Sequence, residues 1–241
     1  MRPGRAGSPG YNGRVPSSFT FSVGAHGKTS GAFYRATDPS VRATLLLAHG
    51  AGAPRTHPFM IDVATRLARK GVDVVTFNFL YAEAGRKMPD RIELLEATWR
   101  AAIATVRARG GLPSERLFIG GKSMGGRIAT RVASAEEGLV LSGVVLLGYP
   151  LHPPGKPQAV REEILGVKLP LLVVQGTRDT FGTAAEMTRI VAAIPRARLH
   201  TVEGGDHSLS LLRSDGADAQ ERALESVAAA IARFLRLKSR T

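Results

Sequence analysis

The sequence predicts a protein of the α/β class, with a mostly parallel central sheet flanked by helices. From residue 44 onward, short continuous apolar runs alternate with longer amphipathic segments, which is typical of buried parallel strands joined by helices. The 241 residues are 44% hydrophobic, enough for one substantial core. The chain has no internal repeat. We therefore expect one folded domain, residues 19–241, after a flexible N-terminal arm, residues 1–18.

The N-terminal part predicts an arm followed by a hairpin. Residues 1–18 are rich in Gly, Pro and Arg and contain no apolar run that could serve as a signal peptide. Residues 19–23 and 32–36 are short strand candidates around three glycines. This spacing is typical of an antiparallel hairpin.

Six apolar runs of strand length predict the parallel part of the sheet. They lie at 44–48, 72–77, 117–120, 143–147, 171–174 and 198–202.

The intervening amphipathic segments predict helices, at 58–70, 91–109, 124–134, 183–194 and 217–237. In the second, Asp90 is the expected N-cap, Glu93 follows three residues later, and Gly110 ends the helix. Apolar side chains recur there at three and four residues, so one face packs on the sheet. Trp99 lies on that face and is predicted to belong to the core.

The segment 149–170 carries five prolines and therefore cannot form one continuous helix. We expect a connection with at most a short helix near residues 159–165. A connection of this length is too short for a large lid, so substrate access should be open.

Composition excludes several classes of function. The net charge of +13 is spread along the chain, with no basic block and interleaved aromatics, so no specific nucleic-acid binding is expected. The chain has no cysteine, which excludes disulfides and thiolate metal sites and fits the cytoplasm, the location we expect. No segment approaches the roughly 18 to 20 apolar residues that cross a bilayer. We expect no cofactor and no metal.

Ser123 is the candidate nucleophile. It lies in Gly-Lys-Ser-Met-Gly, residues 121–125, between a buried strand and a helix. In such a turn the serine adopts a strained backbone conformation, and the flanking glycines let strand and helix approach without a Cβ clash. The strain directs the hydroxyl outward, and the N–H of Met124 can face the same substrate oxygen.

Two other interpretations of this segment are open to test. One is a glycine-rich turn without chemistry. The other is a phosphate-binding loop, because Gly-Lys-Ser ends the P-loop pattern. That pattern requires glycine at position 116, where this chain has Arg116.

A serine hydroxyl needs a base to remove its proton, and the base needs a carboxylate to orient it. Asp179 follows the apolar run 171–174, and His207 follows 198–202. The order serine, aspartate, histidine is that of the α/β-hydrolase fold, and all three follow strands at the carboxyl edge of the sheet. Asp206 is a rival acid, although as the neighbour of His207 it is poorly placed to reach the far ring nitrogen.

The segment His-Gly-Ala-Gly-Ala, residues 49–53, ends the first core strand. This is the usual place of the second oxyanion donor in the same fold, and Ala51 is the best candidate, with Gly52 next. His49 is expected to order this loop, and His49, Gly52 and His152 are possible pocket residues. The other histidines receive structural or surface roles: His26 in the hairpin turn, His57 at a helix start and His200 in the last strand.

The chain resembles the predicted α/β-hydrolases that include bacterial hydrolases of unknown substrate, the testis-expressed protein thirty and the third regulatory subunit of the non-specific-lethal chromatin complex. The resemblance lies in HGAGA (49–53), GGKSMGGR (120–127), YPLHPPGK (149–156), QGTRD (175–179) and GDHS (205–208). It implies a fold related to dienelactone hydrolases and the triad Ser123, Asp179 and His207. The Phe-Gly that commonly follows the family's acid is partly kept, as Thr180, Phe181 and Gly182.

These observations predict a serine hydrolase that cleaves an ester, thioester or similar small acyl substrate through an acyl-Ser123 intermediate. The alternative is a non-catalytic scaffold or binding protein, because some eukaryotic relatives resemble scaffold subunits. A third hypothesis is nucleic-acid association through the basic surface, which would weaken steeply with salt. The sequence does not predict an oligomeric state.

Overall fold

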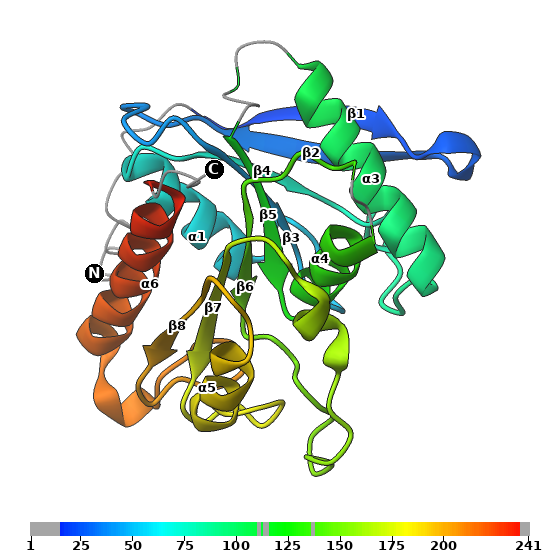
Figure 1. The fold of residues 1–241 in the computed structure, drawn as a ribbon. Coiled ribbons are helices and arrows are strands. Elements are labelled where there is room, and N and C mark those ends of the chain that lie inside the picture. Colours follow the sequence, from blue (N-terminus) through cyan, green and yellow to red (C-terminus); the bar gives the residue numbers. More distant parts are fainter. Residues whose placement is uncertain (1–14, 110–111, 113–115, 136–137, 237–241) are drawn as a thin grey trace, which may run out of the picture.

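Figure 1 presents the fold in a computed structural model, which describes residues 15–109, 112, 116–135 and 138–236. Within these residues, eight strands form one sheet in the order β1-β2-β4-β3-β5-β6-β7-β8. β1 and β2 pair antiparallel, β2 pairs antiparallel with β4, and the remaining neighbours are parallel. The strands are β1 Ser17–Ser22, β2 Lys28–Tyr34, β3 Thr44–Ala48, β4 Asp73–Phe77, β5 Leu117–Lys122, β6 Gly143–Leu147, β7 Leu171–Gly176 and β8 Ala197–Val202.

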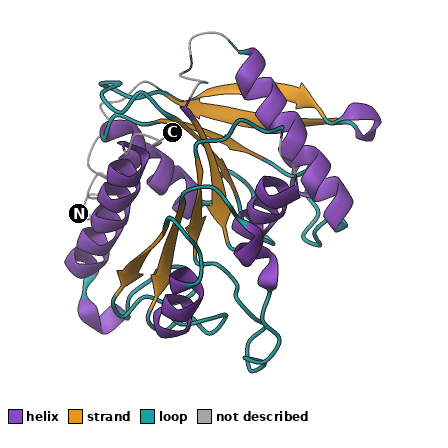
Figure 2. Cartoon of the chain, viewed as in Figure 1, coloured by secondary structure: helices purple, strands orange, loops and turns teal. Residues whose placement is uncertain are grey.

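Helices cover both faces of the sheet (Figure 2). They are α1 Pro58–Arg69, α2 Leu80–Glu83, α3 Ile92–Ala108, α4 Met124–Ala135, α5 Ala184–Ala192 and α6 Ala217–Arg236. Short 3-10 turns occupy Gly24–His26, Glu162–Gly166 and Arg213–Asp215. The predicted α/β-hydrolase architecture, a mostly parallel sheet flanked by helices, is confirmed.

The sheet divides the core into two layers, because successive side chains of a strand point to opposite faces. Leu45 and Leu47 of β3 face α1 and α6, whereas Leu46 and Ala48 face α3, α4 and α5. Trp99 of α3 is fully buried in the second layer, with its ring centroid 4.9 Å from that of Phe77. The prediction that Trp99 belongs to the core is confirmed.

The N-terminal predictions need small corrections. Residues 1–14 of the expected arm lie outside the described residues. Ser17 and Ser18 lie within the predicted arm but already pair with Phe33 and Ala32, so the hairpin begins earlier than expected. Its second strand also begins earlier, at Lys28, because the 3-10 turn ends at His26.

The predicted N-cap of α3 is wrong. The capping position is Arg91, which makes no side-chain capping hydrogen bond. Asp90 instead accepts a hydrogen bond from the Tyr81 N–H at 2.9 Å and pairs with Arg86 at 2.6 Å. Asp90 therefore bonds to α2, a helix too short to show hydrophobic periodicity in the sequence. Gly110, the expected end of α3, lies outside the described residues.

The connection between β6 and β7 contains one 3-10 turn, Glu162–Gly166, close to the predicted short helix. Among the residues that the structure describes, no element forms a lid over the carboxyl edge of the sheet, as expected. No helix in the described part of the chain combines the length and apolar character that a membrane crossing requires.

We predict that Gly120→Ala destabilises the protein strongly. A Cβ at Gly120 would lie 2.0 Å from the Val145 carbonyl oxygen on the neighbouring strand β6, and backbone on both sides of β5 cannot move aside. Such overpacking should lower the free energy of unfolding by about 3 kcal/mol, measured by urea denaturation. The matched control is Gly138→Ala, where an added Cβ meets nothing within 4 Å. Equal midpoints for the two variants would contradict the close approach.

Candidate active site

Ser123, Asp179 and His207 come from three separate loops at the carboxyl edge of the sheet. Ser123 directly follows β5, Asp179 follows β7 and His207 follows β8. Because β5, β6, β7 and β8 are adjacent and parallel, their carboxyl ends meet at one edge. The structure therefore brings together the three residues that the sequence predicted as a triad.

Ser123 lies at the sharp turn from β5 into α4, with a φ of 50°. This left-handed conformation is uncommon for a residue with a side chain. The turn is possible because its neighbours are glycines. A Cβ at Gly121 would lie 2.5 Å from the Gly125 carbonyl carbon, and one at Gly125 would lie 2.5 Å from the His49 carbonyl oxygen. The strained backbone presents the Ser123 hydroxyl at the end of the strand.

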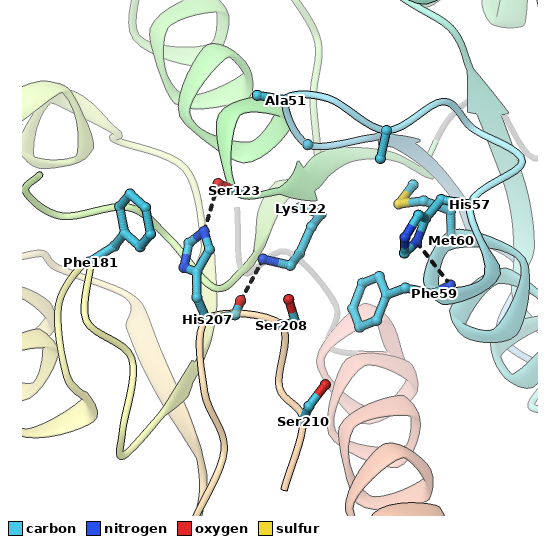
Figure 3. Close-up of a pocket in the computed structure, with 12 residues that line it drawn as sticks. Ala51, His57, Phe59, Met60, Lys122, Ser123, Phe181, His207, Ser208 and Ser210 are labelled. Atoms are coloured by element: carbon cyan, nitrogen blue, oxygen red, sulfur yellow. Dashed lines mark hydrogen bonds between the residues drawn. The ribbon is translucent and has the colours of Figure 1, made fainter. Parts of the chain in front are cut away.

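A continuous chain of hydrogen bonds joins the three side chains. His207 Nε2 lies 2.8 Å from Ser123 Oγ (Figure 3), and His207 Nδ1 lies 2.9 Å from Asp179 Oδ2. Since a carboxylate only accepts, Nδ1 donates to Asp179, which leaves Nε2 of the neutral ring as the acceptor for the serine hydroxyl. The imidazole therefore has the tautomer that can remove the Ser123 proton.

Asp179 is fully buried and held by donors besides His207. Oδ1 accepts from the Phe181 N–H at 2.8 Å, and Oδ2 accepts from Gln175 Nε2 at 2.9 Å. The Phe181 ring packs against the imidazole of His207, with centroids 4.2 Å apart. Sequence reasoning missed Gln175, although a glutamine inside the apolar strand β7 is a signal, because a buried amide needs polar partners.

Asp206, the rival acid, is occupied elsewhere. Its Oδ1 accepts hydrogen bonds from the N–H groups of Ser208 and Ser210, at 2.7 and 2.9 Å. These bonds shape the loop that carries His207. Asp206, the chain neighbour of His207, thus stabilises the backbone of the loop.

The loop after β3 presents Ala51 to the site. His49 Nδ1 lies 2.8 Å from the Gly50 carbonyl oxygen, and Tyr81 Oη donates to the same oxygen at 3.3 Å. The peptide bond is planar and trans, so the Ala51 N–H points opposite to the Gly50 carbonyl. The two donors therefore turn the Ala51 N–H away from the core. Met124 begins α4, where the first N–H groups of a helix lack intrahelical partners.

His49 is an uncharged part of this arrangement. Its ring is fully buried, and burial lowers its pKa to about 4. Nε2 accepts a hydrogen bond from the Phe79 N–H at 3.1 Å, which fixes the proton on Nδ1, where it meets the Gly50 carbonyl. These bonds hold His49 between the loop after β3 and Phe79, the residue before α2. The partner Tyr81 was missed, because it lies in the four-residue helix α2.

A cavity of about 470 Å³ opens beside Ser123. It is lined by Gly50, Ala51, Ala53, His57, Phe59, Met60, Lys122, Ser123, Phe181, His207, Ser208 and Ser210 (Figure 3). The volume suits a small organic ligand.

The structure does not bring the three possible pocket residues to this cavity. His49 turns into the core between Phe79 and Tyr81, and Gly52 lies on the exposed turn of its loop. The His152 ring turns toward α5, where Nε2 lies 3.3 Å from Glu186. By contrast, His57 lines the cavity. It is also the N-cap of α1, where its side chain accepts a hydrogen bond from the Phe59 N–H.

Lys122 is a further cavity residue that sequence reasoning did not assign. It immediately precedes Ser123, and its Nζ donates to the main-chain carbonyl of His207. Burial lowers the pKa of its ammonium group to about 8, partly offset by the charges of Asp179 and Asp206. The side chain thus ties the loop of the candidate base to the strand that carries the candidate nucleophile.

This arrangement can perform nucleophilic acyl transfer. It combines a half-buried hydroxyl at the cavity wall, a base within hydrogen-bond distance and a buried carboxylate behind the base. Among the described residues, no group of three His, Asp or Glu side chains could hold a metal ion.

Comparison with known proteins gives the family and the fold. The family described as alpha/beta hydrolase domain matches residues 41–236, most of the chain. The structure is similar to a serine hydrolase without a lid from Xanthomonas campestris, at 20% identity over 92% of this chain and 94% of that one, with a TM-score of 0.67. It is also similar to a dienelactone hydrolase from Anabaena variabilis, at 21% identity over 91% and 96%, with a TM-score of 0.68.

A third similar structure is the esterase domain of a Rhodothermus marinus protein. It is 16% identical over 92% of this chain and 100% of that one, with a TM-score of 0.66. At these identities the structural similarities establish a shared fold.

We predict that His49 makes stability fall in mild acid. The pKa of His49 is about 4 in the folded protein, below the ordinary histidine value of 6.5, so the unfolded chain binds more protons between these pH values and unfolding becomes easier as the pH falls. Relative to His49→Gln, wild type should lose about 2 kcal/mol of unfolding free energy between about pH 7 and about pH 4.5, measured by urea denaturation.

The control for this experiment is His26→Gln, which removes an exposed histidine and should follow the wild-type pH profile. If His49→Gln and wild type lost stability in parallel, the neutral, buried state of His49 would be contradicted.

Proposed function

The chain belongs to the alpha/beta hydrolase domain family, and on that premise we propose that it is a serine hydrolase acting on small esters or thioesters through an acyl-Ser123 intermediate. The observation that carries this proposal is the unbroken hydrogen-bond chain from Ser123 through His207 to Asp179, which opens on a cavity. The serine hydrolase from Xanthomonas campestris, which shares this fold, supports it as an analogy.

In the first half of the reaction, Ser123 Oγ attacks the substrate carbonyl carbon while its proton passes to His207 Nε2. The imidazolium is stabilised by Asp179, 2.9 Å from Nδ1. The carbonyl oxygen becomes an oxyanion that accepts from the N–H groups of Ala51 and Met124. Collapse of the tetrahedral intermediate breaks the bond to the leaving group, which takes the proton from Nε2 and departs.

In the second half, water replaces the leaving group. His207 Nε2 takes a proton from water, whose oxygen attacks the acyl carbon and forms a second tetrahedral intermediate at the same oxyanion donors. Its collapse releases the acid and returns the proton to Ser123. One oxyanion donor contributes about 3 kcal/mol to transition-state stabilisation, so the orientation of the Ala51 peptide should strongly affect the rate.

Cavity size and access support small or blunt acyl groups. The cavity of about 470 Å³ holds a compact ligand, and the connection between β6 and β7 supplies no lid. Long lipid chains, which need an extended apolar tunnel or a covering element, fit this geometry less well.

Two finer statements belong to the same proposal. The motif at residues 120–127 supports membership in the subgroup that the sequence resembles, the predicted hydrolases that include testis-expressed protein thirty. The continuous sheet and the family match over residues 41–236 support a single domain for the folded part of the chain.

Ser123→Ala should abolish labelling by a fluorophosphonate probe. The probe phosphonylates an activated serine, and Ser123 Oγ is the hydroxyl that His207 would activate. Labelling is measured by intact-protein mass spectrometry. Ser22→Ala, on the exposed edge strand β1, is the matched control and should label like wild type. Absence of label on folded wild type would favour the scaffold alternative, and equal labelling of Ser123→Ala would place the nucleophile elsewhere.

Tyr81→Phe should lower kcat by about tenfold with little change in KM, because misorienting an oxyanion donor weakens transition-state binding alone. The phenol donates to the Gly50 carbonyl at 3.3 Å and has no place in the cavity lining. The matched control, Tyr149→Phe, removes a hydroxyl from an equally buried ring. Steady-state kinetics on a p-nitrophenyl ester measures both variants. Equal kcat values for the two would contradict the proposed role of Tyr81.

A further inference from the structure

The cavity beside Ser123 has a polar side that the acyl-transfer steps do not use. Lys122, Ser208 and Ser210 line this side, while Ala53, Phe59 and Met60 contribute apolar surface. In Figure 3 the Lys122 ammonium and the Ser208 hydroxyl lie close to the main chain of His207, and Ser210 lies farther along the same loop. All three polar side chains can donate hydrogen bonds.

Lys122 carries a charge that the protein leaves without an ion-pair partner. Within the described residues, no carboxylate lies within 4.0 Å of its ammonium, which donates to the neutral carbonyl of His207. Asp179 and Asp206 act on it from a greater distance. At neutral pH the group is mostly charged, because its lowered pKa of about 8 is still above 7. A partly buried charge is costly unless it is paired.

Ser208 and Ser210 are held in place while their hydroxyls stay available. The carboxylate of Asp206 accepts from both backbone N–H groups, at 2.7 and 2.9 Å, so the loop is ordered. Neither hydroxyl has a hydrogen-bond partner among the described residues. Both side chains line the cavity.

His57 adds a donor on the opposite wall. Its Nδ1 accepts from the Phe59 N–H at 3.3 Å, so the proton of the neutral ring lies on Nε2. Of the described residues that line the cavity, none carries a carboxylate. A ligand therefore meets a cation and several donors, and no carboxylate lies on the cavity wall itself.

We propose that this cavity binds acyl groups that carry a carboxylate, with Lys122 as the counter-ion and the hydroxyls of Ser208 and Ser210 as donors. The substrate class is the half-esters or half-thioesters of small dicarboxylic acids. This inference rests on the proposed function, because it names the substrate class of the same site. The net charge of +13 also favours the approach of anionic substrates.

The test compares two p-nitrophenyl esters that differ in one terminal group. The adipate half-ester ends in a carboxylate where the hexanoate ester ends in a methyl group. Wild type should have a kcat/KM for the adipate half-ester that is about tenfold higher, the effect of one charged hydrogen bond. Added NaCl should reduce this ratio, because salt screens charge pairs. A ratio of one or less in wild type would overturn the proposal.

Variants separate substrate recognition from positioning of His207. Lys122→Met removes both the charge and the bond to the His207 carbonyl, so activity on both esters can fall. If Lys122 binds the carboxylate, the ratio of kcat/KM for the adipate half-ester to that for the hexanoate ester should also fall to about one or below. Lys122→Arg should retain a ratio above one. If Lys122→Met lowered both activities and left the ratio unchanged, Lys122 would act through His207 alone and the proposal would be wrong.

A second variant keeps the test independent of Lys122. The double substitution Ser208→Ala with Ser210→Ala leaves the charge in place and should reduce the ratio by about threefold, the effect of a lost neutral hydrogen bond. An unchanged ratio would exclude the two hydroxyls from recognition and contradict the proposal as stated.

Failure of the proposed function gives a different result. In that case neither ester is hydrolysed and the fluorophosphonate probe does not react, which leaves binding itself to be measured. Calorimetric titration of Ser123→Ala with monomethyl adipate and with methyl hexanoate then decides. Selective binding of monomethyl adipate supports the carboxylate site, and equal or absent binding of the two overturns it.

Discussion

The glycines around Ser123 allow three backbone segments to meet, and the geometry of the site depends on this contact. A Cβ at Gly121 or Gly125 would lie 2.5 Å from backbone atoms of α4 or of the loop after β3. Because no side chain intervenes, the turn can hold Ser123 at a φ of 50° and bring the Ala51 loop beside the start of α4. The same contact therefore exposes the hydroxyl and gathers the two candidate oxyanion donors. Gly120 extends the close packing into the sheet, where β5 meets β6.

A set of buried polar bonds orients the groups that surround Ser123. Asp179 receives donors from Gln175 and from the Phe181 N–H as well as from His207, so its charge is compensated without solvent. His49, kept neutral by burial, holds the peptide that carries the Ala51 N–H. His49 is itself held in place by the hydrogen bond that its Nε2 accepts from the Phe79 N–H. Such support keeps catalytic groups in one geometry at little cost in reorganisation during a reaction.

The sequence was sufficient to predict the strands, the main helices and the three residues Ser123, Asp179 and His207, because hydrophobic periodicity and strand-end position are local signals. The pocket was harder to predict. His152 turns toward Glu186 and Gly52 lies on an exposed turn, since side-chain direction depends on contacts between distant loops. Tyr81 and Asp90 meet through the short helix α2, which has no periodicity to detect. Lys122 received no role from the sequence, because its contact with the cavity follows from the packing of the His207 loop over β5.

A crystal structure of the protein after reaction with a fluorophosphonate tests the central claim most directly. We expect electron density that joins the phosphorus atom to Ser123 Oγ, with the phosphonyl oxygen within hydrogen-bond distance of the N–H groups of Ala51 and Met124. His207 should remain bound to Asp179 in that adduct. Density on another residue, or a phosphonyl oxygen directed away from both N–H groups, would contradict the account.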